Sequence, residues 1–176
     1  MSPRILAPLF SLVFACSVGA SDVQIDAPNV VAISANVITS GQPTAGALEK
    51  LASQGFGAVI YLAPPSVPDA VPGEAEIVTK HGMVFINIPI VFSHPTDADL
   101  QAFSAAMSSL KDRKVLVHCQ VNLRASSMTF LYRAIVAHES AEQAYESVAK
   151  VWSPDGPWKL FITSQLQKAG LAFRPY

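Results

Sequence analysis

The chain has 176 residues, of which 51% are hydrophobic and 14% charged, and its formal net charge is −1 at pH 7. This length suits one compact α/β core and is too short for two ordinary domains. The apolar composition excludes an intrinsically disordered chain. Because the near-neutral charge balance offers no basic field, nucleic acid is excluded as a partner.

The first 20 residues have the pattern of an export signal. Arg4 supplies the positive start, residues 5–18 form an apolar stretch, and residues 18–20 are the small residues that a signal peptidase requires. The sequence therefore predicts a signal peptide over 1–20 and a single domain over 21–176. We expect the mature protein to be periplasmic or secreted.

Two other fates of this N-terminal segment are less favoured. Its apolar run contains Pro8 and is short for a membrane span of about 20 residues, so no stable span is expected after processing. Attachment of a lipid through Cys16 is disfavoured because Phe14 stands where small residues are expected. Signal removal would leave Cys119 as the single cysteine, with no disulfide partner in its own chain.

Strand and helix patterns alternate along the rest of the chain. Extended segments are expected at 30–33 and 36–39, and buried parallel strands at 58–62, 83–88 and 114–118. Helices are expected at 45–54, 74–81, 125–138, 141–151 and 157–169, with one more helix that begins at a capping box of Thr96 and Asp99. Trp152 and Trp158 are expected to pack the C-terminal helices on the core. This order implies an α/β fold with a small, mostly parallel central sheet flanked by helices.

The segment from Val115 to Arg124 is predicted to be an anion-binding loop between a strand and a helix. Ligands of parallel sheets bind at the carboxyl ends of the strands, and Cys119 follows one such end. The next helix presents unpaired N–H groups and the positive end of its dipole, and Arg124 adds a guanidinium suited to oxyanions. A Cys119 thiolate and an oxyanion would share this cradle, whose other members are Gln120, Val121, Asn122 and Leu123.

These motifs support a family resemblance. Val-His-Cys after a buried strand, followed by an Arg, a Ser and a helix, resembles the phosphate-binding loop of protein tyrosine and dual-specificity phosphatases. The segment Ser-Gly-Gln-Pro-Thr at 40–44 and the order of elements resemble the bacterial phosphatase-like domains related to that of β-lactamase-hydrolase-like proteins. The resemblance covers nearly all of the mature chain and implies a fold like that of the dual-specificity phosphatases.

The cysteine loop differs in length from the loop of that family. The phosphatase signature places five residues between Cys and Arg, whereas four separate Cys119 from Arg124. Aligned from the cysteine, Asn122 takes the usual glycine position, Ala125 the usual arginine position and Ser126 the usual Ser/Thr position. Asn tolerates left-handed backbone, but a shift by one helical position rotates a side chain by about 100°. Arg124 therefore reaches an anion only if the loop is tighter. A loop of this length also resembles the cysteine loop of rhodanese-type sulfurtransferases.

A phosphatase needs an acid that protonates the leaving alkoxide. In the resembling family this Asp follows the strand equivalent to 83–88, where this chain has Val-Phe-Ser-His and no carboxylate. Asp97, slightly later, is a candidate acid, although helix capping also explains it. Asp69 in the Pro-rich loop is a second candidate. His94 is a third.

The resemblance also assigns supporting roles and a function. His118 resembles the histidine that orients the cysteine loop, and Ser126 would assist release of the thiolate. The histidines show no metal-ligand spacing, and the implied chemistry needs no metal or cofactor. The expected function is hydrolysis of a phosphate monoester, including phosphoproteins, through a cysteinyl-phosphate intermediate, with a phosphate ester or other small oxyanion as ligand. Sulfur transfer through a Cys119 persulfide and a noncatalytic module that binds an oxyanion or a partner stay open as alternatives.

Overall fold

A computed structural model describes residues 24–175, so the predicted signal peptide lies outside the described residues. One sheet has the strand order β1-β2-β5-β3-β4. The strands are β1 (Val31–Ala32), β2 (Val37–Ser40), β3 (Phe56–Tyr61), β4 (Val84–Asn87) and β5 (Lys114–His118). The strands β2, β5, β3 and β4 are parallel, whereas β1 pairs antiparallel with β2 at one edge. The prediction of an α/β fold with a mostly parallel sheet is confirmed.

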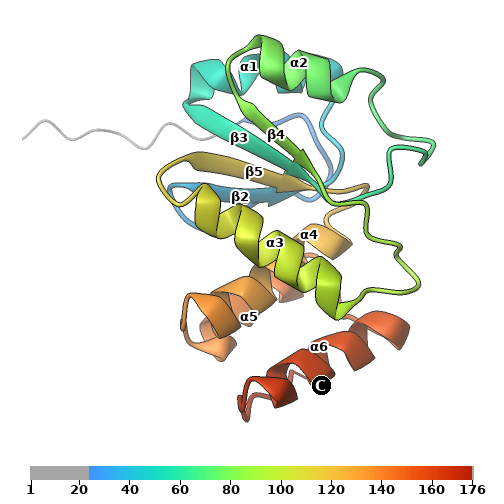
Figure 1. Cartoon of the computed structure of the whole chain (residues 1–176), viewed down its shortest axis with the longest axis vertical. Helices are drawn as coiled ribbons and strands as arrows, with labels where there is room; N and C mark the ends of the chain where they lie inside the picture. Colours follow the sequence, from blue (N-terminus) through green and yellow to red (C-terminus); the bar gives the residue numbers. More distant parts are fainter. Residues whose placement is uncertain (1–23, 176) are drawn as a thin grey trace, which may run out of the picture.

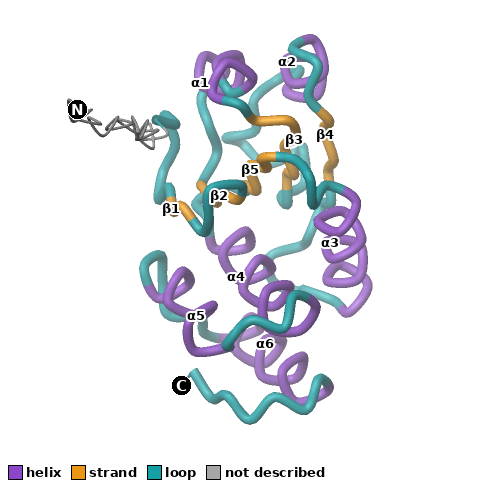
Figure 2. Tube along the Cα trace, turned by 90° about the vertical axis from the view of Figure 1, so that its left-hand side faces the viewer, coloured by secondary structure: helices purple, strands orange, loops and turns teal. Residues whose placement is uncertain are grey.

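Helices cover both faces of this sheet (Figure 1). They are α1 (Ala45–Lys50), the 3-10 turn η1 (Ala52–Gln54), α2 (Glu74–Lys80), α3 (Asp97–Ser109), α4 (Leu123–Leu131), the π-helical turn η2 (Tyr132–Val136), α5 (Ala141–Ala149) and α6 (Gly156–Lys168). The helices α1 and α2 lie on one face, and α3 to α6 lie on the other (Figures 1 and 2). No helix within residues 24–175 is long and apolar enough to cross a membrane.

The alternation of side chains along each strand divides the core into two layers. Ile38, Val59 and Leu116 point toward α1 and α2, where they pack with Leu48 and Val78. Residues of the same strands with the opposite parity pack against α3 to α6, namely Ala58, Ile60, Val115 and Val117. Because both faces of β3 and β5 are covered, these strands read as continuous apolar runs.

Some element boundaries follow local sequence signals and others differ from the prediction. The capping box is confirmed, with the Asp99 N–H donating to Thr96 Oγ1 (3.2 Å) and the Thr96 N–H donating to Asp99 Oδ2 (2.8 Å). The helix predicted at 125–138 begins two residues earlier, at Leu123, and its last turn is π-helical from Tyr132. The helix expected at 45–54 is divided into α1 and η1.

Strand register brings the functional segments to one edge of the sheet. Ser40 at the end of β2 and Tyr61 at the end of β3 both pair with His118 at the end of β5. The loops that follow these three residues therefore leave the sheet side by side. They are the Gly-Gln-Pro segment at 41–43, the Pro-rich loop at 63–73 and the cysteine loop at 119–122.

Candidate active site

The cysteine loop is held by the segment that follows β2. The Cys119 N–H donates to the Ser40 carbonyl (3.3 Å), and the Gln42 N–H donates to the Gln120 carbonyl (2.9 Å). Gly41 forms an isolated bridge with Val121. A Cβ at Gly41 would lie 2.8 Å from the Gln120 carbonyl oxygen. Glycine is thus required for the close approach of the two segments, which explains the Ser-Gly-Gln-Pro-Thr motif in structural terms.

Asn122 shapes the end of the cysteine loop. It adopts left-handed backbone with φ 72°, as expected for a residue in the usual glycine position. Its side-chain Nδ2 donates to the Asn29 carbonyl (2.6 Å) and to Thr39 Oγ1 (3.1 Å). The Asn29 Nδ2 in turn donates to the Val121 carbonyl (3.0 Å). These bonds fix the tight turn that lets α4 begin at Leu123.

The N-terminus of α4 has no side-chain cap. By contrast, the side chains of Thr44, Thr96 and Ser140 cap α1, α3 and α5. The Asn122 side chain, which occupies the capping position, is turned away toward β2 and residue 29. The first N–H groups of a helix have no intrahelical partner, so this uncapped end is suited to an anion.

Arg124 is buried, with 5% of its surface exposed. Its Nε donates to the Ile90 carbonyl (3.0 Å), its Nη1 donates to Gln120 Oε1 (3.4 Å), and its Cζ lies 5.1 Å from the centre of the Phe92 ring. Among the described residues no carboxylate forms an ion pair with it. Because no carboxylate pairs with it directly, the guanidinium is available to an anionic ligand.

Aromatic residues of the C-terminal half hold Phe92 against Arg124. Trp158 is buried, and its indole N–H donates to the Phe92 carbonyl (2.9 Å). The Phe92 ring lies 6.1 Å from that of Trp152 and 5.8 Å from that of Trp158. The expected packing role of both tryptophans is thus observed, and through Phe92 it extends to the arginine.

A buried polar cluster supports the cysteine loop from the α2 side. His118 Nε2 and Glu74 Oε1 are 2.6 Å apart, with 0% and 5% of the two side chains exposed. The second carboxylate oxygen of Glu74 accepts from Gln42 Nε2 (2.8 Å). The Tyr61 ring stacks on the imidazole with 4.7 Å between ring centres. This cluster fixes the imidazole immediately before Cys119, the position expected for a residue that orients the loop.

Tyr61 lies where the charged groups of the site converge. Burial, followed by the negative charges of Glu74 and Asp69, raises the pKa of Tyr61 to about 12, whereas Arg124 acts in the opposite direction. A further contribution that raises this pKa comes from Cys119. The phenol therefore stays protonated at neutral pH. Tyr61 thus lies within electrostatic range of the thiol, the guanidinium and two carboxylates.

The structure treats the two candidate carboxylic acids differently. Asp69 accepts a hydrogen bond from Gln120 Nε2 (2.7 Å), so it contacts the cysteine loop directly. Asp97 instead pairs with Lys168 (2.6 Å) and accepts from Gln165 Nε2 (2.6 Å), both on α6. These two partners lower the pKa of Asp97, which is the wrong direction for a proton donor. The suggestion of Asp97 as acid is thus opposed by its surroundings.

The other predicted site residues differ in exposure. Ser126 is buried in the first turns of α4, where its Oγ donates to the Leu123 carbonyl (3.2 Å). Val121 is exposed at the tip of the loop, whereas Cys119 has no exposed surface. His94 is exposed in the loop after β4.

The sequence did not single out Gln42, Glu74, Tyr61 or Phe92 as parts of the site. Gln42 lies in the Ser-Gly-Gln-Pro-Thr motif, so its position carried a signal. Glu74 and Tyr61 lie far from Cys119 along the chain and reach it only through the sheet register and α2.

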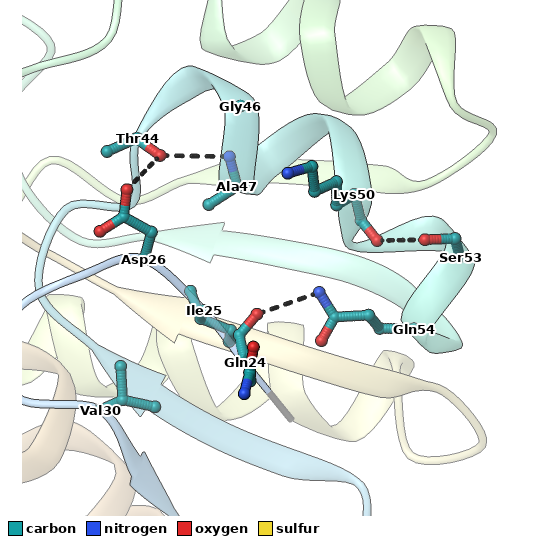
Figure 3. Close-up of a pocket in the computed structure, with 10 residues that line it drawn as sticks. All are labelled: Gln24, Ile25, Asp26, Val30, Thr44, Gly46, Ala47, Lys50, Ser53 and Gln54. Carbon is teal, nitrogen blue, oxygen red and sulfur yellow. Dashed lines mark hydrogen bonds between the residues drawn. The ribbon is translucent and has the colours of Figure 1, made fainter. Parts of the chain in front are cut away.

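A separate hollow lies away from the cysteine loop. A cavity of about 1030 Å³ lies between residues 24–26 and α1 and contains Asp26, Thr44 and Lys50 (Figure 3). None of the cysteine-loop residues lines it. No group of three or more His, Cys, Asp or Glu side chains within residues 24–175 could hold a metal ion.

Comparison with known proteins assigns the family. The family described as a DSP-PTPase phosphatase fused to NAD+ kinase matches residues 19–156. The chain belongs to this family. The expected membership in the protein tyrosine phosphatase superfamily is thereby confirmed.

Individual relatives agree with this assignment. A β-lactamase hydrolase-like protein of Xylella fastidiosa (strain Temecula1) is 29% identical over 109 residues, which are 60% of this chain and 25% of the relative. This chain thus spans about a quarter of the length of the curated relatives it matches. A DUF442 protein of Shewanella putrefaciens CN-32, described as a candidate phosphatase, is 29% identical with a TM-score of 0.74 over 81% of this chain and 91% of its own. PTPMT1 in complex with PI(5)P is 18% identical with a TM-score of 0.68, over 80% of this chain and 96% of its own, and shares the fold.

Proposed function

We propose that this DSP-type domain hydrolyses a phosphate monoester through a cysteinyl-phosphate intermediate. The observation that carries the proposal is the joint position of Cys119 and the buried, carboxylate-free guanidinium of Arg124 at the uncapped N-terminus of α4. An oxyanion bound there meets a positive charge and unpaired N–H groups beside a thiol. PTPMT1 in complex with PI(5)P shows that a neighbour of the same fold binds a phosphate ester.

The reaction has two steps. The Cys119 thiolate attacks phosphorus in line, the bond between phosphorus and the ester oxygen breaks, and its electron pair leaves with that oxygen. Asp69 donates a proton to the departing alkoxide or phenoxide. Water then attacks phosphorus and gives a proton to the Asp69 carboxylate, while the S–P bond breaks and its electron pair returns to sulfur. Arg124 and N–H groups of the loop hold the three equatorial oxygens.

Asp69 is favoured as the acid because its hydrogen-bond partner is a neutral amide on the cysteine loop. Gln120 Nε2 donates to Asp69 while Gln120 Oε1 accepts from Arg124, so one side chain connects acid and anion-binding group. His118 acts as a positioning residue, held by Glu74 and Tyr61. Ser126 remains a proposed aid to thiolate release.

Substitution Cys119→Ser tests the thiolate mechanism. Hydrolysis of 4-nitrophenyl phosphate should fall on the order of 10⁴-fold or more, because a serine hydroxyl lacks the thiolate character that the attack requires. The control is Cys119→Ser bound to inorganic phosphate, measured by calorimetry, which should retain binding. Hydrolysis at the wild-type rate in the variant would refute the mechanism.

We also propose that residues 1–20 are removed during export and that the mature single domain works outside the cytoplasm. Arg4, the apolar run and the small residues at 18–20 support this. N-terminal sequencing of protein recovered from a periplasmic or culture-medium fraction should begin at Ser21. An intact Met1 in protein confined to the cytoplasm would contradict it.

A further inference from the structure

We propose that this site selects monophosphate esters whose alcohol or phenol is apolar and uncharged, and that it discriminates against polyphosphorylated substrates. The inference rests on the proposed function and names its substrate class. It is carried by the apolar side chains and by the charge distribution on the loops that surround Cys119.

Large exposed apolar side chains lie on the loops that carry the site. Val91 is 55% exposed and Phe92 37% exposed in the loop after β4, and Val121 is 44% exposed at the tip of the cysteine loop. The preceding residue, Ile90, accepts the hydrogen bond from Arg124 Nε. Val91 and Phe92 are therefore the next residues along the chain after the contact with Arg124. Exposed apolar surface next to a charged ligand site is suited to the apolar part of that ligand.

The Pro-rich loop adds apolar volume on the other side of the site. A hollow of about 400 Å³ lies between this loop, β4 and α2, and its lining combines apolar residues, among them Val67, Ala70 and Phe85, with Tyr61, Glu74 and Glu76. Tyr61 is also the ring that stacks on His118, immediately before the nucleophile. Tyr61 thus connects the hollow with the residue before Cys119, and the apolar part of the lining is suited to an aromatic or aliphatic group of a substrate.

The loops around Cys119 carry few cationic side chains. The segments at the carboxyl edge of the sheet, 41–44, 63–73, 88–96 and 119–123, contain no lysine or arginine. Arg124 is thus the single guanidinium that these segments enclose, and Asp69 and Glu74 bring negative charge. A second phosphate group on the substrate would lose water without gaining a cation and would be repelled by these carboxylates. The site therefore offers enough positive charge to bind one phosphate group.

Competing hydrolysis of two substrates tests this specificity. We expect kcat/KM of the full chain for 2-naphthyl phosphate to exceed that for inositol hexakisphosphate by at least about tenfold, the cost of one unmade charge-assisted hydrogen bond. Equal values, or a preference for the inositol polyphosphate, would overturn the specificity and leave the phosphatase function intact. Failure to hydrolyse either substrate would instead overturn the proposed function itself.

A charge insertion sharpens the test. Val91→Lys should narrow the ratio of the two kcat/KM values by raising the rate with inositol hexakisphosphate, since it adds a cation beside Arg124. The matched control is Leu160→Lys on α6, at a side chain that is 73% exposed, which should leave the ratio unchanged. An equal effect of both lysines, or no effect of Val91→Lys, would overturn the role assigned to the apolar loops.

Discussion

The two candidate acids, Asp69 and Asp97, lie in different surroundings. Asp69 lies in the Pro-rich loop, and Asp97 lies at the N-terminus of α3. Asp69 meets a neutral amide, Gln120 Nε2, on the cysteine loop. Asp97 meets the Lys168 ammonium and the Gln165 amide on α6, on the helical side of the molecule. An ammonium partner favours the ionised carboxylate, so a carboxyl group without one is better suited to donate a proton to a ligand. The carboxylate nearer along the chain to the expected acid position is thus paired with a lysine, whereas the more distant one contacts the cysteine loop.

The largest effect expected from this comparison concerns Asp69→Asn. For an alkyl phosphate, kcat/KM should fall about 10²- to 10⁴-fold, because the alkoxide departs without a proton. For 4-nitrophenyl phosphate the loss should be smaller, since nitrophenolate leaves unprotonated. Kinetics of both substrates in the variant and the wild type measure this difference. A wild-type rate on the alkyl phosphate would contradict the role of Asp69 as the acid.

An intermediate effect is expected from Gln120→Leu. Removal of the amide breaks the bonds to Asp69 and Arg124, and kcat/KM should fall about 10- to 100-fold, as for lost hydrogen bonds to charged groups. The double variant with Asp69→Asn should lose less than the product of the two single effects, because both act through one contact. Gln101→Leu, at an exposed position of α3, is the control and should be neutral. Strict additivity would show that Gln120 does not position Asp69.

The smallest effect is expected from Asp97→Asn. Its kcat/KM should stay within about twofold of the wild type, as for changes at separate sites without shared partners. The substitution should lower Tm slightly at neutral pH, because the ion pair with Lys168 is lost. Since these partners lower the pKa of Asp97, its stabilisation is present above the unfolded-state pKa and is lost as pH falls through the folded-state pKa. The Tm difference between variant and wild type should therefore disappear in acid. A large loss of activity in Asp97→Asn would reverse the assignment of the two aspartates.

Local signals predicted much of the fold. The apolar run at 114–118 coincides with β5, and the Thr96–Asp99 capping box marks the start of α3. Such elements depend on side chains that are close in sequence, so their patterns carry the information. The early start of α4 was not predicted, because it depends on the left-handed Asn122, which residues 29 and 39 stabilise from a distant part of the chain.

The site was predicted less completely than the fold. Cys119 and Arg124 follow from the motif, and the expected tight loop is consistent with the position of Arg124 against Ile90 and Phe92. The pairing of Glu74 with His118 depends on where the register of β3 and β5 and the packing of α2 bring two distant segments together. No local pattern encodes such a contact.

The central claim is tested most directly by the mass of the covalent intermediate. The full chain is mixed with 4-nitrophenyl phosphate, quenched rapidly in acid and analysed by intact and peptide mass spectrometry, with thiosulfate as the parallel reagent. We expect one added phosphoryl group on the peptide that contains Cys119, absent from Cys119→Ser, and no added sulfur after thiosulfate. Addition of a sulfur atom from thiosulfate without a phosphoryl adduct would contradict this expectation in favour of sulfur transfer, and no adduct with either reagent, despite phosphate binding, would favour a noncatalytic module.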